Sequence, residues 1–389
     1  MHHRTGTWLR RLDHPLSVVL LIAAAYAAYL GLRWHRFGGD WSRFICAGDE
    51  FCDPDRVPAG VFVRPRSSGY DGQFYYRLAL DPFSRRPSDF GIRLDAPAYR
   101  HQRIVYPLLA WLVSGGNPQH VPAALVALNF AGLLVFAALA ALWARIVGQH
   151  ALWGLLIALY PGFVATFARD LTEILQSCFL LSTLLCLHRG RITYATVLLA
   201  LAVLTRETAL GLVLGIGLYI AEQSVRGRRA ALRFWPAFVL PTGVYLAWQS
   251  ALRWWWGEWP LTGGAGTLGR PLGGLSTFVS QLGAHPGNLA GAWLAQLVLL
   301  GLVTIAVLWT WRRASTLPAV RAAWVLYALL AAVLTTKIWV DDWAFLRALT
   351  EFYVLGAAIL IAAAGRLRFL VLTLLPLAWL IAARTHRPG

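Results

Sequence analysis

The sequence predicts an all-α membrane protein, a polytopic transmembrane helix bundle, and three observations support this fold class. The chain has 389 residues, of which 58% are hydrophobic and only 14% are charged. Its mean hydropathy of +0.56 exceeds that of ordinary soluble domains. Apolar stretches of about 17 to 25 residues recur, and each can cross roughly 30 Å of hydrocarbon as a helix. Because no internal repeat or separate soluble domain stands out, we expect residues 1–389 to form a single integral membrane domain.

About eleven spans are expected, each beginning and ending where the apolar residues do. They are Leu16–Leu32, Val121–Val147, Ala151–Phe167, Leu171–Leu187, Ile192–Leu204, Thr208–Ala221, Phe234–Gln249, Leu289–Trp311, Ala319–Thr336, Glu351–Ala364 and Phe369–Ala383. A further stretch, Ile104–Val113, is too short to span and is expected at the interface. Residues 192–221 fit one long helix or two. Two helices are favoured because Arg206 and Glu207 would be costly in mid-bilayer.

The distribution of charge predicts the orientation. Arginines recur in alternate short loops and mark the cytoplasmic side, among them Arg10, Arg11, Arg145, Arg312 and Arg313. Nearly all carboxylates then fall on the exoplasmic side, which indicates chemistry there. We expect an uncleaved first anchor with a cytoplasmic N-terminus in the plasma membrane, the inner membrane of a bacterium, and an active site on the exoplasmic side.

Two long exoplasmic loops are expected. Residues 33–103 form the first, which is long enough for short interfacial helices and contains Cys46 and Cys52, either as a disulfide or as two thiols. Residues 251–288 form the second, which is rich in glycine and tryptophan and is expected to act as a mobile lid. Its tryptophans suit either a headgroup belt or the stacking of sugar rings.

The net charge of +17 does not indicate nucleic acid as a partner. The cations are spread over many loops without a basic stripe or a DNA-reading motif, so anionic lipids are the expected partners. The acidic residues near Cys52 lack the spacing of a known metal loop. We therefore expect no metal site there and no cofactor.

The most informative segment is residues 70–76, in which a lone carboxylate, Asp71, stands among aromatic residues outside the first span. Two interpretations are open. Asp71 suits the N-cap of a helix that begins at Gly72. It equally suits a partly desolvated carboxylate whose basicity is tuned for catalysis.

Further ionisable groups lie on the same side of the membrane. Asp170 and Glu173 fit the capping of a helix start, although that leaves Arg169 unexplained, because a cation is unfavourable at a helix N-terminus. Arg206 with Glu207 fits a structural salt bridge or a ligand site, and the same alternatives apply to the turn with Lys337, Asp341, Asp342 and Arg347. Arg103 fits a snorkelling arginine or a contact to a lipid phosphate.

Four segments in this order carry a resemblance to a known family. Tyr70-Asp71-Gly72-Gln73-Phe74-Tyr75-Tyr76-Arg77-Leu78-Ala79 resembles the Trp-Asp-Gly-x-x-Tyr-x-x-Ile-Ala stretch of the GPI mannosyltransferase II-like family, within the glycosyltransferase C superfamily. Residues 103–109, 160–173 and 204–209 are similar to three further segments of that family, Phe-x-Pro-Leu-Tyr-Pro-Leu-Leu, Tyr-Pro…Tyr-Thr-Glu-Ser and Leu-Thr-Arg-Pro-Thr-Gly. The similarity covers about residues 16–221. It departs from the family at Tyr70, which replaces tryptophan, at Glu207, which replaces proline, and at Arg169 and Asp170, where an aromatic residue is usual.

The resemblance implies a transferase that moves mannose or another hexose or pentose from a polyprenyl-phosphate carrier to a lipid or glycan acceptor. Asp71 would be the catalytic base of an inverting reaction. Charge grows on the departing phosphate, so cations aimed at it would accelerate the reaction. The expected substrate-binding residues are Arg169 and Arg206 for the phosphate, then Lys337 and Arg103, with Glu173 and Glu207 orienting them or binding sugar, and Tyr70, Gln73 and Asp170 beside them.

Two other classes of function remain open. A transporter or lipid flippase also has many helices and embedded charges, although paired repeats and midplane charges are expected of it. A non-catalytic membrane assembly subunit would bind a partner through its first loop. That subunit would tolerate Asp71→Asn, because asparagine caps helices about as well as aspartate.

Overall fold

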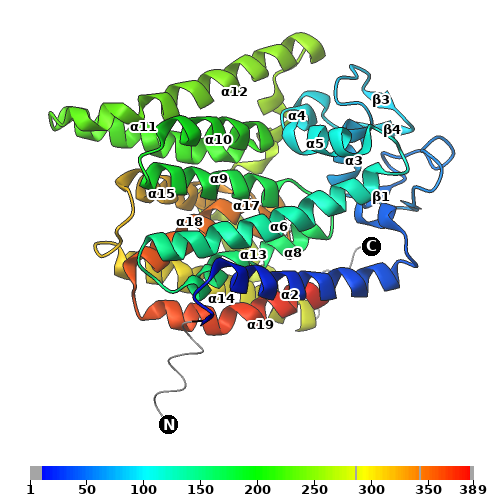
Figure 1. Ribbon diagram of the computed structural model, residues 1–389. Coiled ribbons are helices and arrows are strands. Elements are labelled where there is room, and N and C mark those ends of the chain that lie inside the picture. The colour runs from blue at the N-terminus through cyan, green and yellow to red at the C-terminus, as the bar shows by residue number, and fades with distance from the viewer. Residues whose placement is uncertain (1–10, 285–286, 341–342, 386–389) are drawn as a thin grey trace.

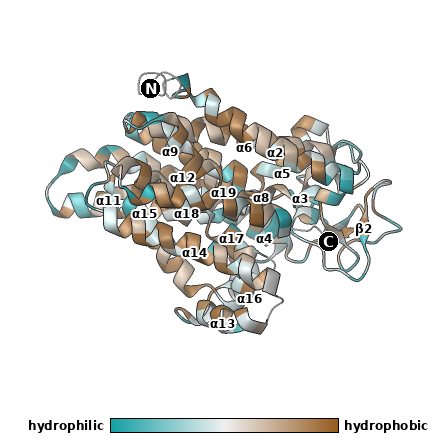
Figure 2. Cartoon of the chain, turned by 90° about the horizontal axis from the view of Figure 1, so that it is seen from below, coloured by the Kyte–Doolittle hydropathy of each residue, from teal (hydrophilic) through white to brown (hydrophobic). Residues whose placement is uncertain are grey.

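The computed structural model describes residues 11–284, 287–340 and 343–385, which fold into a bundle of helices (Figure 1). The small strands and short helices of the first long loop gather at one end of this bundle. Hydrophobic residues colour most of the helices, and hydrophilic residues concentrate in the connections (Figure 2). The mostly helical fold confirms the all-α class.

Six of the described helices are long and apolar enough to span a membrane. They are Pro15–Arg36 (α2), Val121–Ile146 (α6), Glu207–Val225 (η3 with α11), Arg229–Trp256 (η4 with α12), Leu289–Thr310 (most of α14) and Leu367–Thr385 (α19). Shorter apolar helices accompany them: Val105–Ser114 (α5), Glu173–His188 (α9), Ile192–Thr205 (α10), Pro318–Val333 (α15) and Thr350–Ala363 (α18). These helices indicate an integral membrane protein. The number of eleven spans stays a prediction.

The expected span Ala151–Phe167 is wrong as a single helix. The segment is broken into η2 (Ala151–Gly154), α7 (Leu155–Ala158) and α8 (Gly162–Phe167). Pro161 causes the second break, because it disfavours helical backbone at the preceding residue, Tyr160. The break places the Tyr160 ring against that of Tyr353, with centroids 4.3 Å apart. Composition alone could not reveal this broken path.

Residues 192–221 form two helices, as predicted. Helix α10 ends at Thr205, and Arg206 is extended, with φ −161° and ψ 130°. The chain restarts through η3 (Glu207–Ala209) into α11 (Leu210–Val225). The break lets the Arg206 side chain reach buried carboxylates instead of lipid.

The first loop holds several short elements between α2 and α5. They are η1 (Trp41–Phe44), β1 (Ala47–Gly48), β2 (Val63–Arg64), α3 (Gly72–Leu80), β3 (Ser88–Asp89), β4 (Ile92–Arg93) and α4 (Pro97–His101). Strand β1 pairs with β2 in parallel, and β3 pairs with β4 in antiparallel fashion. Cys52 is a thiol whose Sγ donates to Gln73 Oε1 at 3.2 Å, so no disulfide joins it to Cys46.

The second loop is folded against the first. After α12 (Trp235–Trp256) come η5 (Pro260–Thr267), α13 (Gly273–Gln281) and η6 (Leu282–Ala284). A Cβ at Gly263 in η5 would lie 2.6 Å from Cβ of Tyr99 in α4, so only glycine permits this close approach. The His101 ring of α4 also lies 5.3 Å from the Trp256 ring. The predicted lid is therefore seated on α4.

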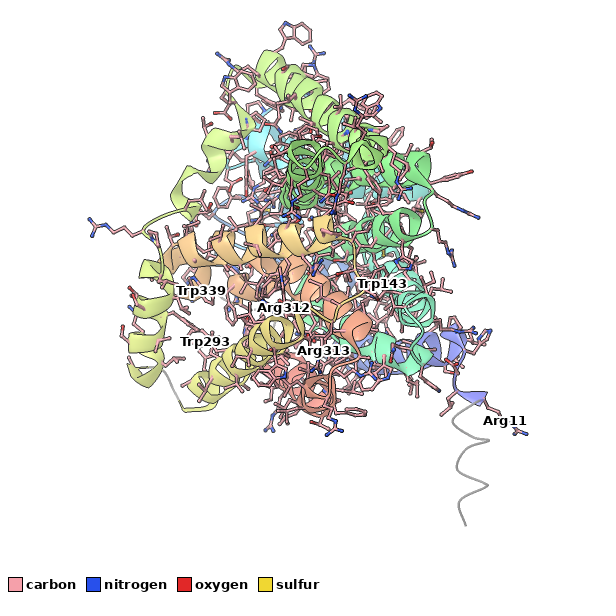
Figure 3. The ribbon with its side chains drawn as sticks, turned by 90° about the vertical axis from the view of Figure 1, so that its left-hand side faces the viewer. Arg11, Trp143, Trp293, Arg312, Arg313 and Trp339 are labelled. Carbon is pink, nitrogen blue, oxygen red and sulfur yellow. The ribbon has the colours of Figure 1, made fainter. Side chains whose placement is uncertain are left out.

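The last part of the chain returns to the end of the bundle at which the first loop lies. Helix α14 (Gly287–Thr310) leads to α15, which is followed by α16 (Thr336–Val340), α17 (Ala344–Ala348) and α18. Arg11, Arg312 and Arg313 lie at the opposite end, which faces the viewer in Figure 3. The arginine-rich turns and the first loop therefore occupy opposite ends of the bundle.

Candidate functional site

Asp71 is the first residue of the site, and it is not a helix cap. It occupies the N-cap position of α3, yet its side chain makes no capping hydrogen bond. Its Oδ1 lies 2.9 Å from Arg100 Nη1, and its Oδ2 lies 3.0 Å from Arg347 Nη2. The carboxylate is therefore held by two arginines, one from α4 and one from α17. This overturns the capping interpretation of Asp71.

Gly72 allows this arrangement. A Cβ at this position would lie 2.3 Å from the Arg169 carbonyl oxygen and 2.7 Å from that of Ile45. Real Cβ atoms do not approach backbone so closely, so only glycine fits between these two segments. The contact brings Asp71 beside the turn that precedes α9.

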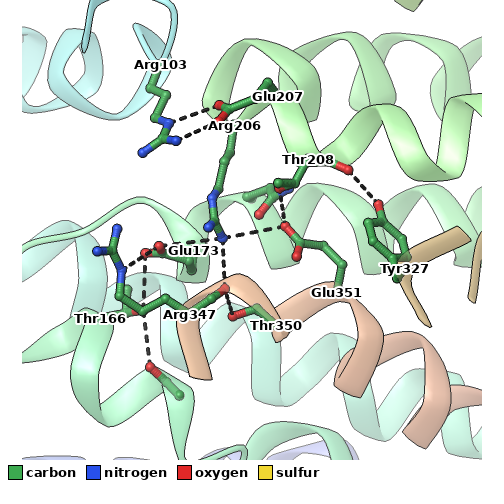
Figure 4. A network of polar contacts seen from close by, with 12 residues as sticks. Arg103, Thr166, Glu173, Arg206, Glu207, Thr208, Tyr327, Arg347, Thr350 and Glu351 are labelled. Atoms are coloured by element: carbon green, nitrogen blue, oxygen red, sulfur yellow. Dashed lines mark hydrogen bonds and ion pairs between the residues drawn. The ribbon is translucent and has the colours of Figure 1, made fainter. Parts of the chain in front are cut away.

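Arg347 connects Asp71 to a second carboxylate, Glu173. Arg347 Nε donates to Glu173 Oε1 at 2.8 Å, and the Thr166 hydroxyl lies 3.2 Å from Glu173 Oε2 (Figure 4). Glu173 is completely buried at the start of α9. Because a buried carboxylate is stable only when it is paired and hydrogen-bonded, Glu173 requires these partners.

Arg206 belongs to the same group of ion pairs as Arg347 and Glu173. Its Nη1 is 3.5 Å from Glu173 Oε1, 3.6 Å from Glu351 Oε1 and 3.0 Å from the Arg347 carbonyl oxygen. The Thr208 hydroxyl donates to Glu351 (Figure 4). The sequence led us to expect Arg206 on the substrate phosphate. The structure instead surrounds it with protein acceptors and leaves it 6% exposed.

Arg103 and Glu207 form a pair that joins the first loop to the start of η3. Arg103 Nε and Nη2 lie 2.9 Å and 2.5 Å from the two carboxylate oxygens of Glu207. The same guanidinium donates to the hydroxyls of Tyr75, at 3.1 Å, and Tyr99, at 2.7 Å. Burial lowers the pKa of Arg103, but Glu207 and the two tyrosines raise it by more, so it stays cationic. Arg103 is thus a buried structural cation and not a snorkelling one.

Asp71, like Glu207, whose side chain is 19% exposed, is more accessible to solvent than Glu173 and Glu351. Its side chain is 21% exposed, whereas those of Glu173 and Glu351 are 0% exposed. Burial by itself raises the pKa of Asp71, but Arg100, then Arg347 and Arg103, lower it by more, so the pKa lies well below its usual range. Asp71 is therefore an ionised carboxylate with partial access to solvent.

A small cavity is lined by Tyr70, the residue that precedes Asp71. The Arg169 guanidinium lies 4.0 Å from the centroid of the Tyr70 ring, and that of Arg347 lies 5.1 Å from it. Tyr70 and Arg169 line a cavity of about 70 Å³ together with Arg43, Arg64 and Ser67. Among the described residues lining it there are three arginines and no carboxylate. We call this cavity the arginine pocket; its charge suits an anion.

Two of the expected site residues lie elsewhere. The Gln73 amide is used within the loop, where its oxygen accepts from Gly48 N at 3.0 Å and its nitrogen donates to the Ser68 carbonyl at 2.8 Å. Lys337 lies exposed on α16 and takes no part in the ion pairs around Asp71. Asp341 and Asp342 lie outside the described residues. Gln73 therefore holds the loop together instead of facing a substrate.

Asp170 is a buried acid of a different kind. It adopts a left-handed backbone with φ 51° and is 0% exposed, and its oxygens have no hydrogen-bond partner among the described residues. Burial raises its pKa well above the usual range, and the nearby Asn129 amide lowers it by less. Helix α9 has Thr172 at its N-cap position, without a side-chain capping bond. The expected capping by Asp170 is therefore wrong, because the N-cap position of α9 belongs to Thr172 and not to Asp170.

Sequence reasoning missed Arg100 and Glu351 and gave Arg347 no special weight. Arg100 lies three residues before Arg103, on the same side of a short helical turn, which is a usable signal. Glu351 begins an otherwise apolar span, where an isolated acid indicates a partner nearby. Arg100 and Glu351 each pair with a residue from a distant segment. A single sequence does not show which distant residues form such pairs.

In the described part of the chain, no group of three or more histidine, cysteine, aspartate or glutamate residues is arranged to hold a metal ion. The acids of the cluster are instead neutralised by arginines. Searches against protein-family models, curated proteins and solved structures found no match to this chain.

Proposed function

We propose that the protein transfers a sugar from a polyprenyl-phosphate carrier to a hydroxyl group of a lipid or glycan acceptor, with inversion at the anomeric carbon. One observation carries the proposal: Asp71 is an ionised, partly exposed carboxylate, and the residue before it, Tyr70, lines the arginine pocket. The resemblance of residues 70–79 to a family of such transferases supports the same reaction. The arginine-rich turns at the opposite end of the bundle support an exoplasmic position for this site, because cytoplasmic loops carry an excess of arginine.

Asp71 is suited to accept the proton of the acceptor hydroxyl. Its Oδ2 accepts an N–H of Arg347, its Oδ1 forms an ion pair with Arg100, and both oxygens keep lone-pair capacity for a hydroxyl donor. As the acceptor oxygen bonds to the anomeric carbon, its proton passes to Asp71. The bond from that carbon to the phosphate oxygen breaks, and its electron pair leaves with the polyprenyl phosphate.

The two arginines that hold Asp71 make it a weak base until the donor binds. Arg347 lies near the Tyr70 ring on which Arg169 also stacks, so a phosphate bound there would attract both guanidinium groups. Its negative charge would raise the pKa of Asp71 and weaken the Asp71–Arg347 pair. Donor binding would thereby activate Asp71 as the base. Arg347 and Arg169 would also stabilise the charge that grows on the leaving phosphate.

Glu173, Arg206 and Glu351 act in this proposal by positioning Arg347. Their ion pairs are with one another and with Arg347, and their side chains are buried. Of the two roles expected for Glu173, the contacts support the orientation of cations over the binding of sugar.

The test is transfer of radiolabelled hexose or pentose from polyprenyl phosphate in proteoliposomes. Asp71→Asn should lower the rate by about 10²- to 10⁴-fold, the usual contribution of a general base. Asp53→Asn, which alters an exposed acid of the same loop that pairs with Arg56, is the matched control and should retain the rate. Asp71→Glu, which restores a carboxylate, should recover part of the rate if Asp71→Asn still folds. Equal rates for the wild type and Asp71→Asn would refute the proposal.

A further inference from the structure

A groove runs between α2 and α19 on the surface of the bundle. In Figure 1 these two helices lie along the same edge, at its lower side. The groove has a volume of about 340 Å³ and is lined on its walls by Ala25, Ala28, Leu32, Leu380 and Ala383. This volume lies within the usual range of ligand sites, about 300 to 1,000 Å³. Both helices are long and apolar enough to span a membrane, so we expect the groove between them to meet lipid.

Aromatic residues form the floor of the groove. The ring of Trp379 lies 5.4 Å from that of Tyr26 and 6.4 Å from that of Tyr29, measured between centroids. These ring contacts join α2 to α19 beneath the alanine and leucine side chains that line the walls of the groove. The result is an apolar channel suited to a hydrocarbon chain.

Cations gather at the end of the groove that lies next to the first loop. Arg33, Arg36 and Arg384 line it there, without a carboxylate among the described lining residues. Arg33 is 4% exposed and is fixed by two donations to the Tyr29 hydroxyl, at 3.0 Å and 2.8 Å. A guanidinium has five N–H donors, so Arg33 retains donors beyond those two. An apolar channel that ends in arginines matches a lipid with a phosphate headgroup.

The groove leads toward the arginine pocket. The guanidinium groups of Arg33 and Arg43 lie 5.9 Å and 6.0 Å from the same Phe37 ring. Arg33 belongs to the groove, whereas Arg43 belongs to the pocket that Tyr70 and Arg169 also line. Arginines therefore follow one another from the membrane surface to the neighbourhood of Asp71.

We infer that the groove between α2 and α19 binds the isoprenoid chain of the polyprenyl-phosphate donor, with the phosphate entering along Arg33, Arg36 and Arg384. This inference rests on the proposed function and names the route by which its lipid substrate arrives. A single chain fits between two helices whose facing residues are largely alanine and leucine. The phosphate would pass from Arg33 to Arg43 and Arg169 before reaction.

The test measures binding without chemistry, using native mass spectrometry of the full chain in detergent with a polyprenyl phosphate that carries no sugar. The double variant Arg36→Gln with Arg384→Gln should weaken binding by about 10- to 100-fold, as expected for two lost charge-assisted contacts. Ala28→Trp, which fills the groove and leaves its charge unchanged, should weaken binding as well. The matched control, Arg312→Gln with Arg313→Gln, removes the same charge at the opposite end and should bind as the wild type does.

The outcomes separate the inference from the proposed function. Binding lost in the groove variants but kept in Asp71→Asn supports the inference, whether or not transfer is observed. Unchanged binding in both groove variants overturns the inference, while the effect of Asp71→Asn on transfer still judges the proposed function. Equal binding of phosphatidylglycerol and polyprenyl phosphate would also overturn it, because the groove would then be a general phospholipid site.

Discussion

Arg347 Nη2 lies 3.0 Å from Asp71 Oδ2, and this contact joins residues 276 positions apart in the chain. The same guanidinium donates through Nε to the buried Glu173. Arg347 therefore ties the first loop, the start of α9 and the segment before α18 into one site. Its loss would leave two carboxylates short of a partner.

The first prediction concerns Arg347→Gln. Glu173 would keep only Arg206, at 3.5 Å, as a cation, while Asp71 would keep Arg100. Breaking a buried ion pair from one side costs about 3 to 5 kcal/mol. Thermal unfolding of the purified protein should show a marked decrease in Tm.

Arg226→Gln is the control for this variant. Arg226 pairs with Glu222 on the surface of α11, with side chains 57% and 46% exposed. Exposed pairs contribute about 0 to 1 kcal/mol, so the Tm should hardly change. An equal loss of stability in both variants would show that Arg347 has no special role.

The second prediction concerns pH. The pKa of Asp71 is lowered in the folded protein, whereas the unfolded value is about 3.9. Its ion pairs therefore contribute stability that is fully present above about pH 5 and is lost as the pH falls below about 4. The Tm difference between the wild type and Asp71→Asn should stay constant from pH 8 to pH 5 and shrink below pH 4. A difference that already shrinks between pH 7 and pH 6 would contradict the lowered pKa.

The third prediction concerns Gly72→Ala. The added methyl group would meet the Arg169 carbonyl oxygen at 2.3 Å, so the backbone of one segment must move. We expect a loss of several kcal/mol in stability and a large decrease in transfer, since Asp71 is the neighbouring residue. Gly31→Ala is the control: nothing lies within 4 Å of its Cβ position in α2, and alanine there should stabilise the helix by about 0.5 to 1 kcal/mol. Unfolding curves and transfer rates of the two variants make the comparison.

The fold class could be predicted because hydrophobicity and length determine which segments are buried in lipid. The break at Arg206 was equally accessible, since ionisable residues in an apolar segment require a turn. The broken path of residues 151–167 could not be predicted. The composition of this segment is apolar throughout, and its path depends on Pro161 and on contacts with Tyr353.

The site was predictable only in part. Asp71, Glu173 and Arg103 were recognised because polar residues beside apolar spans require partners. The partners themselves come from distant segments, as with Arg347 for Asp71 and Glu351 for Arg206, and one sequence carries no record of such pairing. Gln73 was misplaced for a related reason, since its loop partners Gly48 and Ser68 form no motif.

The last prediction contrasts Asp170 with Glu173, two fully buried acids three residues apart. Burial raises the pKa of Asp170 and so favours its neutral form, which Asp170→Asn resembles in charge and size. Asparagine also tolerates the left-handed backbone at φ 51°. We expect Tm and transfer rate close to those of the wild type. Glu173→Gln, in contrast, removes the charge opposite Arg347 and Arg206 and should cost about 3 to 5 kcal/mol. A similar loss in both variants would mean that Asp170 is ionised and has a partner of its own.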